Sequence, residues 1–255
     1  MSQQDHECDL FLMSSHQAYD ANNALAEFAR RGARNIHGWG IGSYSDRTAR
    51  ILRSEAPATD GIDLSREFAI AIQAVNSPVI LGHLRRTSRG TTKRENNHPF
   101  LLNFLGYDWL CIHNGSASRD KQFLPPEETI IRDSDSDTPR VFEFIRKQVL
   151  DYLSAGPSKS LTEAFRTAFE KLLDADPEGQ FNLIISNGNL SFAFIHWRTF
   201  YLLNREKDPG NAALISTLKL TDNERWQPFD RRSDRKAKML VFSGPSLVVN
   251  ADVPK

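Results

Sequence analysis

Four short segments of the 255-residue chain carry side chains suited to catalysis or ligand binding. They are Cys8, residues 83–88 (His-Leu-Arg-Arg-Thr-Ser), residues 113–115 (His-Asn-Gly) and residues 133–137 (Asp-Ser-Asp-Ser-Asp). Their thiol, imidazole, guanidinium, amide and carboxylate groups serve in nucleophilic attack, proton transfer and the binding of charged ligands. The second and third segments each follow an apolar, strand-like run, which would hold them on a rigid frame at its open end.

Each segment taken alone also has a plain structural explanation. Asn114-Gly115 is a common turn sequence, and Asp137 suits the start of a helix, where the helix dipole favours a carboxylate. Arg85 could be a solvated charge at the end of a strand. The functional interpretation therefore depends on the segments occurring together.

The two cysteines have different surroundings. Cys111 lies in an apolar run and is expected to be a buried small hydrophobe, so neither a disulfide framework nor a cysteine-rich zinc site is predicted. Cys8, in contrast, could be a nucleophile whose base is His83 or His113. The cysteine of such a Cys–His pair is expected near a helix N-terminus, where the dipole stabilises the thiolate. The apolar run that starts at Cys8 predicts a strand, so this alternative lacks support from a helix dipole.

Histidines invite a metal hypothesis, since His83, His98 and His113 fall within 31 residues. None of these spacings is i, i+2 or i, i+4, and the nearby carboxylates form no recognised ligand pattern. We expect neither a metal nor another cofactor.

The elements that must position these residues are clustered by type along the chain. Strands are expected over 8–13, 38–44, 49–53, 79–84 and 109–113, with helices over 21–31 and from Asp63 to Pro78 among them. Two helices follow, over 139–150 and 161–172, the second with a Ser160/Glu163 capping box. Five more strands are expected over 181–185, 191–196, 199–203, 213–217 and 239–242, with an Asn187-Gly188 hairpin turn. This clustered order predicts an α+β fold of antiparallel sheets covered by helices, in layers.

Composition excludes several classes of protein. Thirty-two basic and 32 acidic residues give no net charge, so no overall field attracts nucleic acid or an anionic membrane. No run approaches the roughly 18 apolar residues of a membrane span. The polar, acidic start is unlike a signal peptide, and we expect a cytoplasmic protein.

Taken together and in this order, the segments resemble the glutaminase domain of class II glutamine amidotransferases, above all the small stand-alone bacterial members. These are N-terminal-nucleophile hydrolases with an αββα sandwich of two antiparallel sheets between helix layers. The resemblance runs from Cys8 to about Trp226. Its further motifs are Arg31-Gly32, Gly38-Trp39-Gly40-Ile41, Gly82-His83-Leu84-Arg85, Glu95-Asn96-Asn97-His98-Pro99-Phe100, His113-Asn114-Gly115, Ser136-Asp137 and the segment from Leu220 to Trp226.

The resemblance implies a mechanism. The thiol of Cys8 would attack the γ-carboxamide of glutamine with its own α-amine as base, and Asn114 and Gly115 would form the oxyanion hole. Arg85 would bind the substrate α-carboxylate and Asp137 the α-ammonium. The resemblance also places a pocket hydroxyl and several supporting residues: Ser88, and then Arg31, Gly38, Trp39, His83, His98 and His113.

The start of the chain departs from the family pattern, which usually begins Met-Cys. Seven residues precede Cys8 here, and an acylated nitrogen cannot act as a base. We therefore expect residues 1–7 to be a leader cut at Glu7–Cys8 and residues 8–255 to form the amidotransferase domain. Two further departures are Arg86 and Pro139; a second positive charge beside Arg85 could extend the substrates beyond glutamine.

Three functions remain open at this point. The chain could release ammonia from glutamine for a synthase partner subunit, since no acceptor domain is recognisable in it. It could hydrolyse another γ-glutamyl amide, such as a glutathione-like compound or a biosynthetic intermediate. It could also be an inactive relative with a regulatory role.

Overall fold

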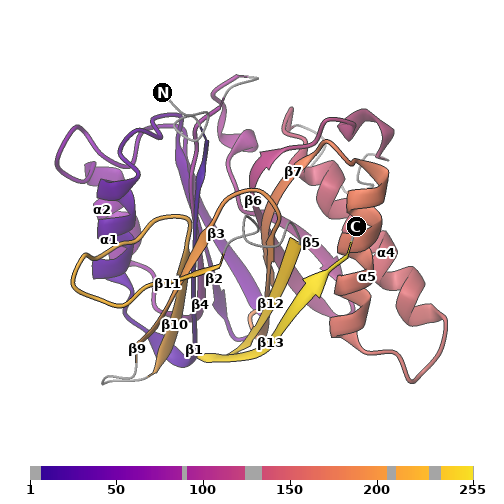
Figure 1. Ribbon diagram of the computed structural model, residues 1–255. Coiled ribbons are helices and arrows are strands. Elements are labelled where there is room, and N and C mark those ends of the chain that lie inside the picture. Colours follow the sequence, from indigo (N-terminus) through magenta and orange to yellow (C-terminus); the bar gives the residue numbers. More distant parts are fainter. Residues whose placement is uncertain (1–6, 88–90, 124–133, 206–210, 230–236, 255) are drawn as a thin grey trace.

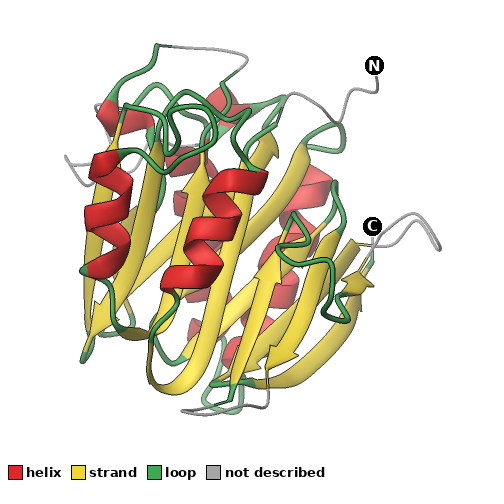
Figure 2. Cartoon of the chain, turned by 90° about the vertical axis from the view of Figure 1, so that its left-hand side faces the viewer, coloured by secondary structure: helices red, strands yellow, loops and turns green. Residues whose placement is uncertain are grey.

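The computed structural model describes residues 7–87, 91–123, 134–205, 211–229 and 237–254. Two antiparallel sheets lie face to face, and a pair of helices covers the outer side of each (Figure 1). Figure 2, turned by 90°, shows one helix pair in front of the strands that it covers. The predicted α+β fold with an αββα sandwich is confirmed.

The first sheet has seven strands in the order β11-β9-β10-β1-β4-β2-β3. Along the chain these are β1 (Asp9–Tyr19), β2 (Trp39–Ser45), β3 (Thr48–Ser54), β4 (Ser77–Leu84), β9 (Phe200–Arg205), β10 (Ala212–Ser216) and β11 (Gln227–Phe229). Its outer face packs against α1 (Asn22–Arg31) and α2 (Arg66–Gln73).

The second sheet has six strands in the order β13-β12-β8-β7-β6-β5. These are β5 (Phe100–Phe104), β6 (Tyr107–Ser116), β7 (Gln180–Ser186), β8 (Leu190–Ile195), β12 (Ala237–Ser243) and β13 (Ser246–Val253). Its outer face packs against α4 (Thr138–Ser154) and α5 (Leu161–Ala175). Two short 3-10 helices, η2 (Arg94–Asn96) and η3 (Asp120–Gln122), lie in the connections.

Three apolar clusters hold the four layers together: one between the sheets and one under each helix pair. The cluster between the sheets includes Leu12 of the first sheet and Ile184 of the second. Phe28 on α1 and Phe165 on α5 belong to the two outer clusters. Fully burying one such side chain contributes about 1.5–3 kcal/mol, so the sandwich gives the strand ends a firm frame.

Several local predictions are confirmed. The Ser160 hydroxyl accepts a hydrogen bond from the Glu163 amide at 3.2 Å, which begins α5 as the capping pattern indicates. Gly188 has φ +84° in the turn between β7 and β8, a conformation that favours glycine.

Other local predictions were wrong. Helix α2 begins after Ser65, whose hydroxyl caps it, and not at Asp63. It ends at Gln73, so that Pro78 lies inside β4. Strands β5, β11 and β13 were not predicted from the sequence.

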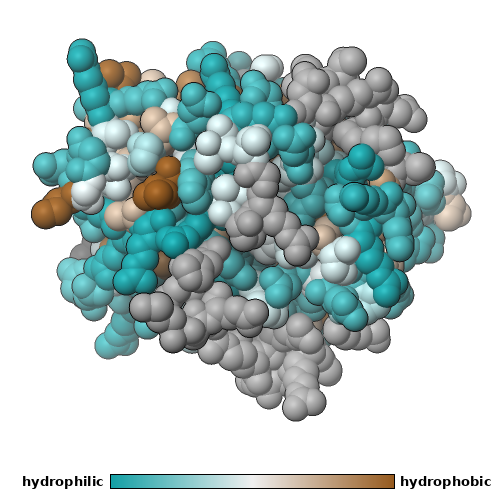
Figure 3. All heavy atoms as spheres, turned by 90° about the horizontal axis from the view of Figure 1, so that it is seen from above, coloured by the Kyte–Doolittle hydropathy of each residue, from teal (hydrophilic) through white to brown (hydrophobic). Residues whose placement is uncertain are grey.

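The outer surface fits the balanced composition. Seen from above, the part of the molecule that is described is mostly hydrophilic, with separate small apolar areas (Figure 3). Among the described helices, none combines the length and the apolar character needed to cross a bilayer.

Candidate active site

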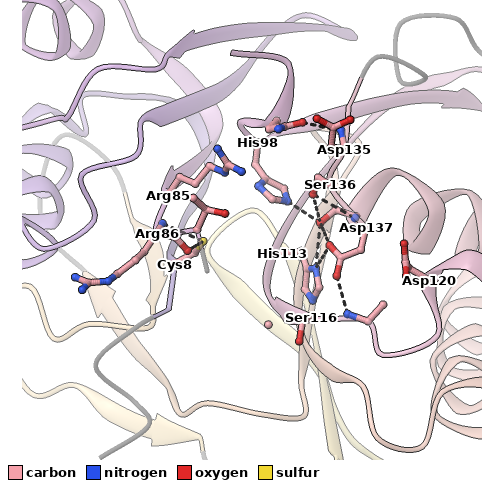
Figure 4. Close-up of a pocket in the computed structure, with 15 residues that line it drawn as sticks. Cys8, Arg85, Arg86, His98, His113, Ser116, Asp120, Asp135, Ser136 and Asp137 are labelled. Carbon is pink, nitrogen blue, oxygen red and sulfur yellow. Dashed lines mark hydrogen bonds and ion pairs between the residues drawn. The ribbon is translucent and has the colours of Figure 1, made fainter. Parts of the chain in front are cut away.

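The sheet register brings the four sequence segments to one pocket. In the first sheet Asp9 pairs with Leu84, so Cys8 lies beside the residues that follow β4. The end of β6 and the start of α4 form the facing wall (Figure 4). The cavity of about 180 Å³ is lined by residues from all four segments, among them Cys8, Arg85, His98, His113, Gly115 and Asp137.

Cys8 is held through its sulfur by the residue after Arg85. The Arg86 amide donates to Sγ at 3.3 Å, and the thiol lies 3.4 Å from the Arg86 carbonyl oxygen. Burial raises the pKa of the Cys8 thiol to about 11, although the Arg86 hydrogen bond and the Arg85 charge act in the opposite direction. At neutral pH the group is therefore a thiol that needs a base before it can attack.

The carbonyl group of Cys8 is held as firmly as its sulfur. Asn114 Nδ2 donates to the Cys8 oxygen at 2.5 Å, and Arg198 Nη1 donates to it at 3.0 Å. Asn114 is fully buried, and within the described chain its Oδ1 atom has no hydrogen-bond partner. An amide nitrogen has two protons, so Asn114 retains one donor beyond the bond to Cys8.

Gly115 occupies a position that only glycine fits. Its φ of +131° is rarely adopted by other residues, and an added Cβ would lie 2.0 Å from the Gln180 carbonyl oxygen. The backbone of β6 thus makes a close approach to β7 at the edge of the pocket.

Arg85 contributes a buried positive charge to one wall. Its side chain is directed toward the cavity in Figure 4, and it donates to the Thr91 carbonyl oxygen at 3.2 Å. Arg85 is only 6% exposed, and none of the carboxylates in the described ranges forms an ion pair with it. Burial lowers the pKa of Arg85, but a guanidinium stays charged in proteins, so the site can bind an anion.

Asp137 contributes a negative charge to the facing wall. It is the N-cap residue of α4, and its Oδ2 accepts a hydrogen bond from the Ala117 amide at 2.6 Å. Burial alone would raise its pKa, but His113, the Ala117 amide and the Thr138 hydroxyl lower it below the ordinary value. The pocket therefore has opposite charges on opposite walls (Figure 4).

Three buried histidines support this second wall. The Thr138 hydroxyl lies 2.9 Å from His98 Nε2 and 3.0 Å from His113 Nδ1. The His83 ring packs on His98, with 4.1 Å between their centroids. In the described part of the chain no group of three or more His, Cys, Asp or Glu residues is arranged to hold a metal ion.

These histidines predict a pH-dependent stability. Burial lowers the pKa of His83 from 6.5 to about 3, helped by the Arg85 charge; burial likewise lowers that of His98. Below pH 6.5 these two histidines bind protons in the unfolded chain but stay neutral in the folded chain. The free energy of unfolding therefore falls as the pH falls. We expect each histidine to reduce the free energy of unfolding by about 1 kcal/mol per pH unit on average between pH 7 and pH 5, with the slope approaching about 1.4 kcal/mol per unit at the acid end, measured by urea unfolding.

The control for this prediction compares two substitutions. His83→Asn should reduce the slope of stability against pH, whereas His16→Asn, at an exposed position, should leave it unchanged. Equal slopes in wild type and His83→Asn would contradict it.

The remaining predicted residues lie in different places. Gly38 has φ +111°, and its carbonyl oxygen accepts from the Arg85 amide at 2.8 Å, which fixes the backbone of Arg85. Trp39 is the first residue of β2. Its side chain is buried between the first sheet and its helices, where it packs edge-on against Phe68. Ser88 lies outside the described residues.

The side chains of two further arginines are engaged outside the cavity. Arg31 is at the end of α1 and forms an ion pair with Asp222 at 2.7 Å, with both side chains well exposed and neither lining the pocket. The Arg86 side chain points away from the cavity in Figure 4 and donates to the Arg34 carbonyl oxygen at 2.7 Å. It does not add a second charge to the wall that Arg85 forms.

Arg198 and Thr138 also contribute to the site, although the sequence did not indicate them. Arg198 follows β8 and contacts Cys8 across 190 residues of chain, so no local pattern indicates it. Thr138 is the first residue of α4, and its hydroxyl meets His98 and His113 only because the chain folds these distant segments together.

Known proteins share both the sequence pattern and the fold. The family profile described as class-II glutamine amidotransferases matches residues 7–211. YafJ of Escherichia coli is 24% identical over 250 residues, covering 86% of this chain and 93% of that protein. A Haemophilus influenzae relative is 26% identical over 249 residues, covering 86% of this chain and 80% of its own.

Solved structures with little sequence identity have the same fold. A predicted glutamine amidotransferase from Pseudomonas aeruginosa superposes with a TM-score of 0.59 at 20% identity, covering 96% of this chain and 99% of that one. The glutamine phosphoribosylpyrophosphate amidotransferase of Bacillus subtilis gives a TM-score of 0.67 at 16% identity, covering 97% of this chain but 49% of that one. The profile match spans most of the sequence, and this chain belongs to the class II glutamine amidotransferases.

Proposed function

We propose that this protein hydrolyses the side-chain amide of glutamine through a γ-glutamyl thioester on Cys8. The observation that carries the proposal is the composition of the pocket: it is lined by a thiol, by Gly115 and by opposite charges on facing walls, and the Asn114 side chain contacts the carbonyl group of the thiol residue. These are the groups that such a reaction requires.

The chemistry would proceed in two steps. The Cys8 α-amine, once free, takes the thiol proton while Sγ bonds to the amide carbon, and the carbonyl electrons move onto oxygen. The second N–H of Asn114 and the Gly115 amide would stabilise that oxyanion. Collapse expels ammonia with the proton returned by the amine, and water then hydrolyses the thioester to glutamate.

The charges of the pocket support selection of a free amino acid. Arg85 would bind the α-carboxylate and Asp137 the α-ammonium, which a glutamine within a peptide chain lacks. The pKa of Asp137 is lowered, so its carboxylate is ionised at neutral pH as this role requires.

The mechanism requires that the Cys8 nitrogen is released from Glu7. Glu7 Oε1 accepts a hydrogen bond from the Trp197 indole at 2.7 Å, so the residue before the nucleophile is held beside the site. The unpartnered Oδ1 of Asn114 is a suitable acceptor for an α-ammonium formed there. We propose cleavage at Glu7–Cys8, with residues 8–255 as the working domain.

Ammonia release tests the function directly. Purified protein should release glutamate from glutamine, together with ammonia, faster than it releases glutamate from glutathione-like γ-glutamyl peptides at equal concentration, because cleavage of those peptides yields an amine and not ammonia. Faster cleavage of the peptides would indicate the other γ-glutamyl amide hydrolase, and no release from either would indicate an inactive relative.

Arg85→Met should raise the KM for glutamine by about 10- to 100-fold, because a charged hydrogen-bond pair with the α-carboxylate is lost. The measurement is steady-state ammonia release from glutamine and from 4-aminobutanamide, which lacks that carboxylate. Wild type and variant should differ little on the second compound. Arg86→Met, the neighbouring arginine directed away from the cavity, is the matched control. An unchanged KM in Arg85→Met would contradict the assignment.

A further inference from the structure

Arg198 contacts the proposed nucleophile without lining the pocket. Its Nη1 atom donates to the Cys8 carbonyl oxygen at 3.0 Å and lies 3.3 Å from Asp9 Oδ1. Its guanidinium is held between the Cys8 carbonyl oxygen and the Asp9 carboxylate, and the side chain is absent from the cavity lining, so it can touch Cys8 while leaving the substrate untouched. This separates Arg198 from Arg85, whose guanidinium faces the cavity.

The turn that carries Arg198 is built around one buried amide. Asn182 on β7 is fully buried, and its Oδ1 accepts from the amides of His196, Trp197 and Arg198 at 3.0, 2.8 and 3.2 Å. Its Nδ2 donates to the Arg198 carbonyl oxygen at 2.8 Å. Four hydrogen bonds from one side chain fix the backbone of this turn, and hence the direction from which Arg198 approaches Cys8.

The charge of Arg198 is balanced by a carboxylate that is itself held in place. Asp9 is 6% exposed, and it accepts from Asn35 Nδ2 at 2.6 Å and from the Thr217 hydroxyl at 2.8 Å. Thr217 in turn accepts from the Leu10 amide at 3.0 Å. Arg198, Asp9 and Thr217 therefore link the start of β1 to the turn between β8 and β9 and to the segment that follows β10.

We propose that Arg198 is a positioning residue for Cys8, an inference that rests on the proposed function. Arg198 and Asn114 donate to the same carbonyl oxygen, so together they fix the peptide plane that follows the nucleophile. The thiol and the α-amine branch from the same Cα, and a fixed plane limits how that atom can turn. A misplacement of about 1 Å at a reacting group can cost about 100-fold in rate.

The test is steady-state ammonia release from glutamine by Arg198→Met and Arg198→Lys. Arg198→Met should lower kcat by about 10- to 100-fold and leave KM within about twofold, because no substrate contact is lost. Arg198→Lys keeps the charge and should recover part of kcat. Arg205→Met, which removes two hydrogen bonds from Arg205 on β9 to Glu224, is the matched control for loss of a partly buried ion pair.

The pH dependence gives a second readout, which a merely structural role would not move. The charged groups facing Cys8 in the cleaved protein are Arg85, Asp9 and Arg198. Removing Arg198 takes a positive charge away from the Cys8 backbone, which favours the protonated α-amine and should shift the acid limb of kcat/KM to higher pH. The double variant Arg198→Met/Asp9→Asn removes both charges and should keep the low kcat without this shift.

The outcomes are distinct. Ammonia release by the wild type reports the proposed function, and its absence would refute that function itself. With an active wild type, normal kcat in Arg198→Met, a loss equal to that of Arg205→Met, or a change in KM alone would overturn the role of Arg198. If Arg198→Met folds poorly, the double variant, which leaves no unpaired buried carboxylate, decides the same question through its kcat.

Discussion

Cys8→Ala should abolish ammonia release, lowering kcat by more than about 10⁴-fold, because no other described group in the pocket can form the thioester. Binding should persist, since Arg85 and Asp137 remain. The measurements are ammonia release and the mass of the protein after rapid acid quench with glutamine. The wild type should carry a γ-glutamyl adduct, and the variant none.

The other cysteine provides the control for this substitution. Cys111 is fully buried on β6, and burial raises the pKa of its thiol far above the ordinary value. Cys111→Ala should lose some stability but keep its kcat. Substantial turnover by Cys8→Ala would refute the assignment of the nucleophile.

Asn114→Ala should lower kcat by about 100- to 1,000-fold, the usual effect of losing one oxyanion donor. The side chain also donates to the Cys8 carbonyl oxygen at 2.5 Å, so the effect should lie at the upper end of that range. Because the donor acts mainly on the transition state, KM should change much less than kcat. Steady-state kinetics with glutamine measure both quantities.

Asn103→Ala is the matched control, since Asn103 is an exposed asparagine on β5 in the same sheet. It should leave kcat unchanged. A loss of less than about fivefold in Asn114→Ala would mean that the oxyanion is stabilised elsewhere, for example by backbone groups alone.

The sequence predicts the layers well because their pattern is local. Apolar stripes on α1, α4 and α5 and apolar runs in β1 and β4 follow directly from side-chain periodicity. The missed β13 alternates exposed and half-buried residues at the edge of its sheet, with only its last residue, Val253, buried, and the missed β5 is a short edge strand. Edge strands carry weaker apolar signals, since one side of the pairing is open.

The pocket was predictable only in part, because some of its residues stand in local motifs and others reach it only through long-range contacts. Cys8, Arg85, Asn114 and Asp137 each stand in a recognisable short motif. The pocket brings three of them together, and Asn114 joins them through its hydrogen bond to Cys8. Arg198 stands in no motif and reaches Cys8 only through the turn that Asn182 fixes.

Arg31 shows that a recognisable motif does not determine the contacts of its residues. Its Arg-Gly motif suggested a supporting role, but the length and direction of α1 place the side chain in an ion pair with Asp222. A motif states which residue is present, whereas the packing of its helix determines what that residue touches.

The N-terminus of active protein provides the most direct test of the mechanism. Intact-mass analysis and N-terminal sequencing of preparations that release ammonia should find a chain beginning at Cys8, with residues 1–7 removed. Full turnover by protein whose Glu7–Cys8 bond is intact would contradict the account, because a nitrogen within a peptide bond cannot take the proton from the thiol.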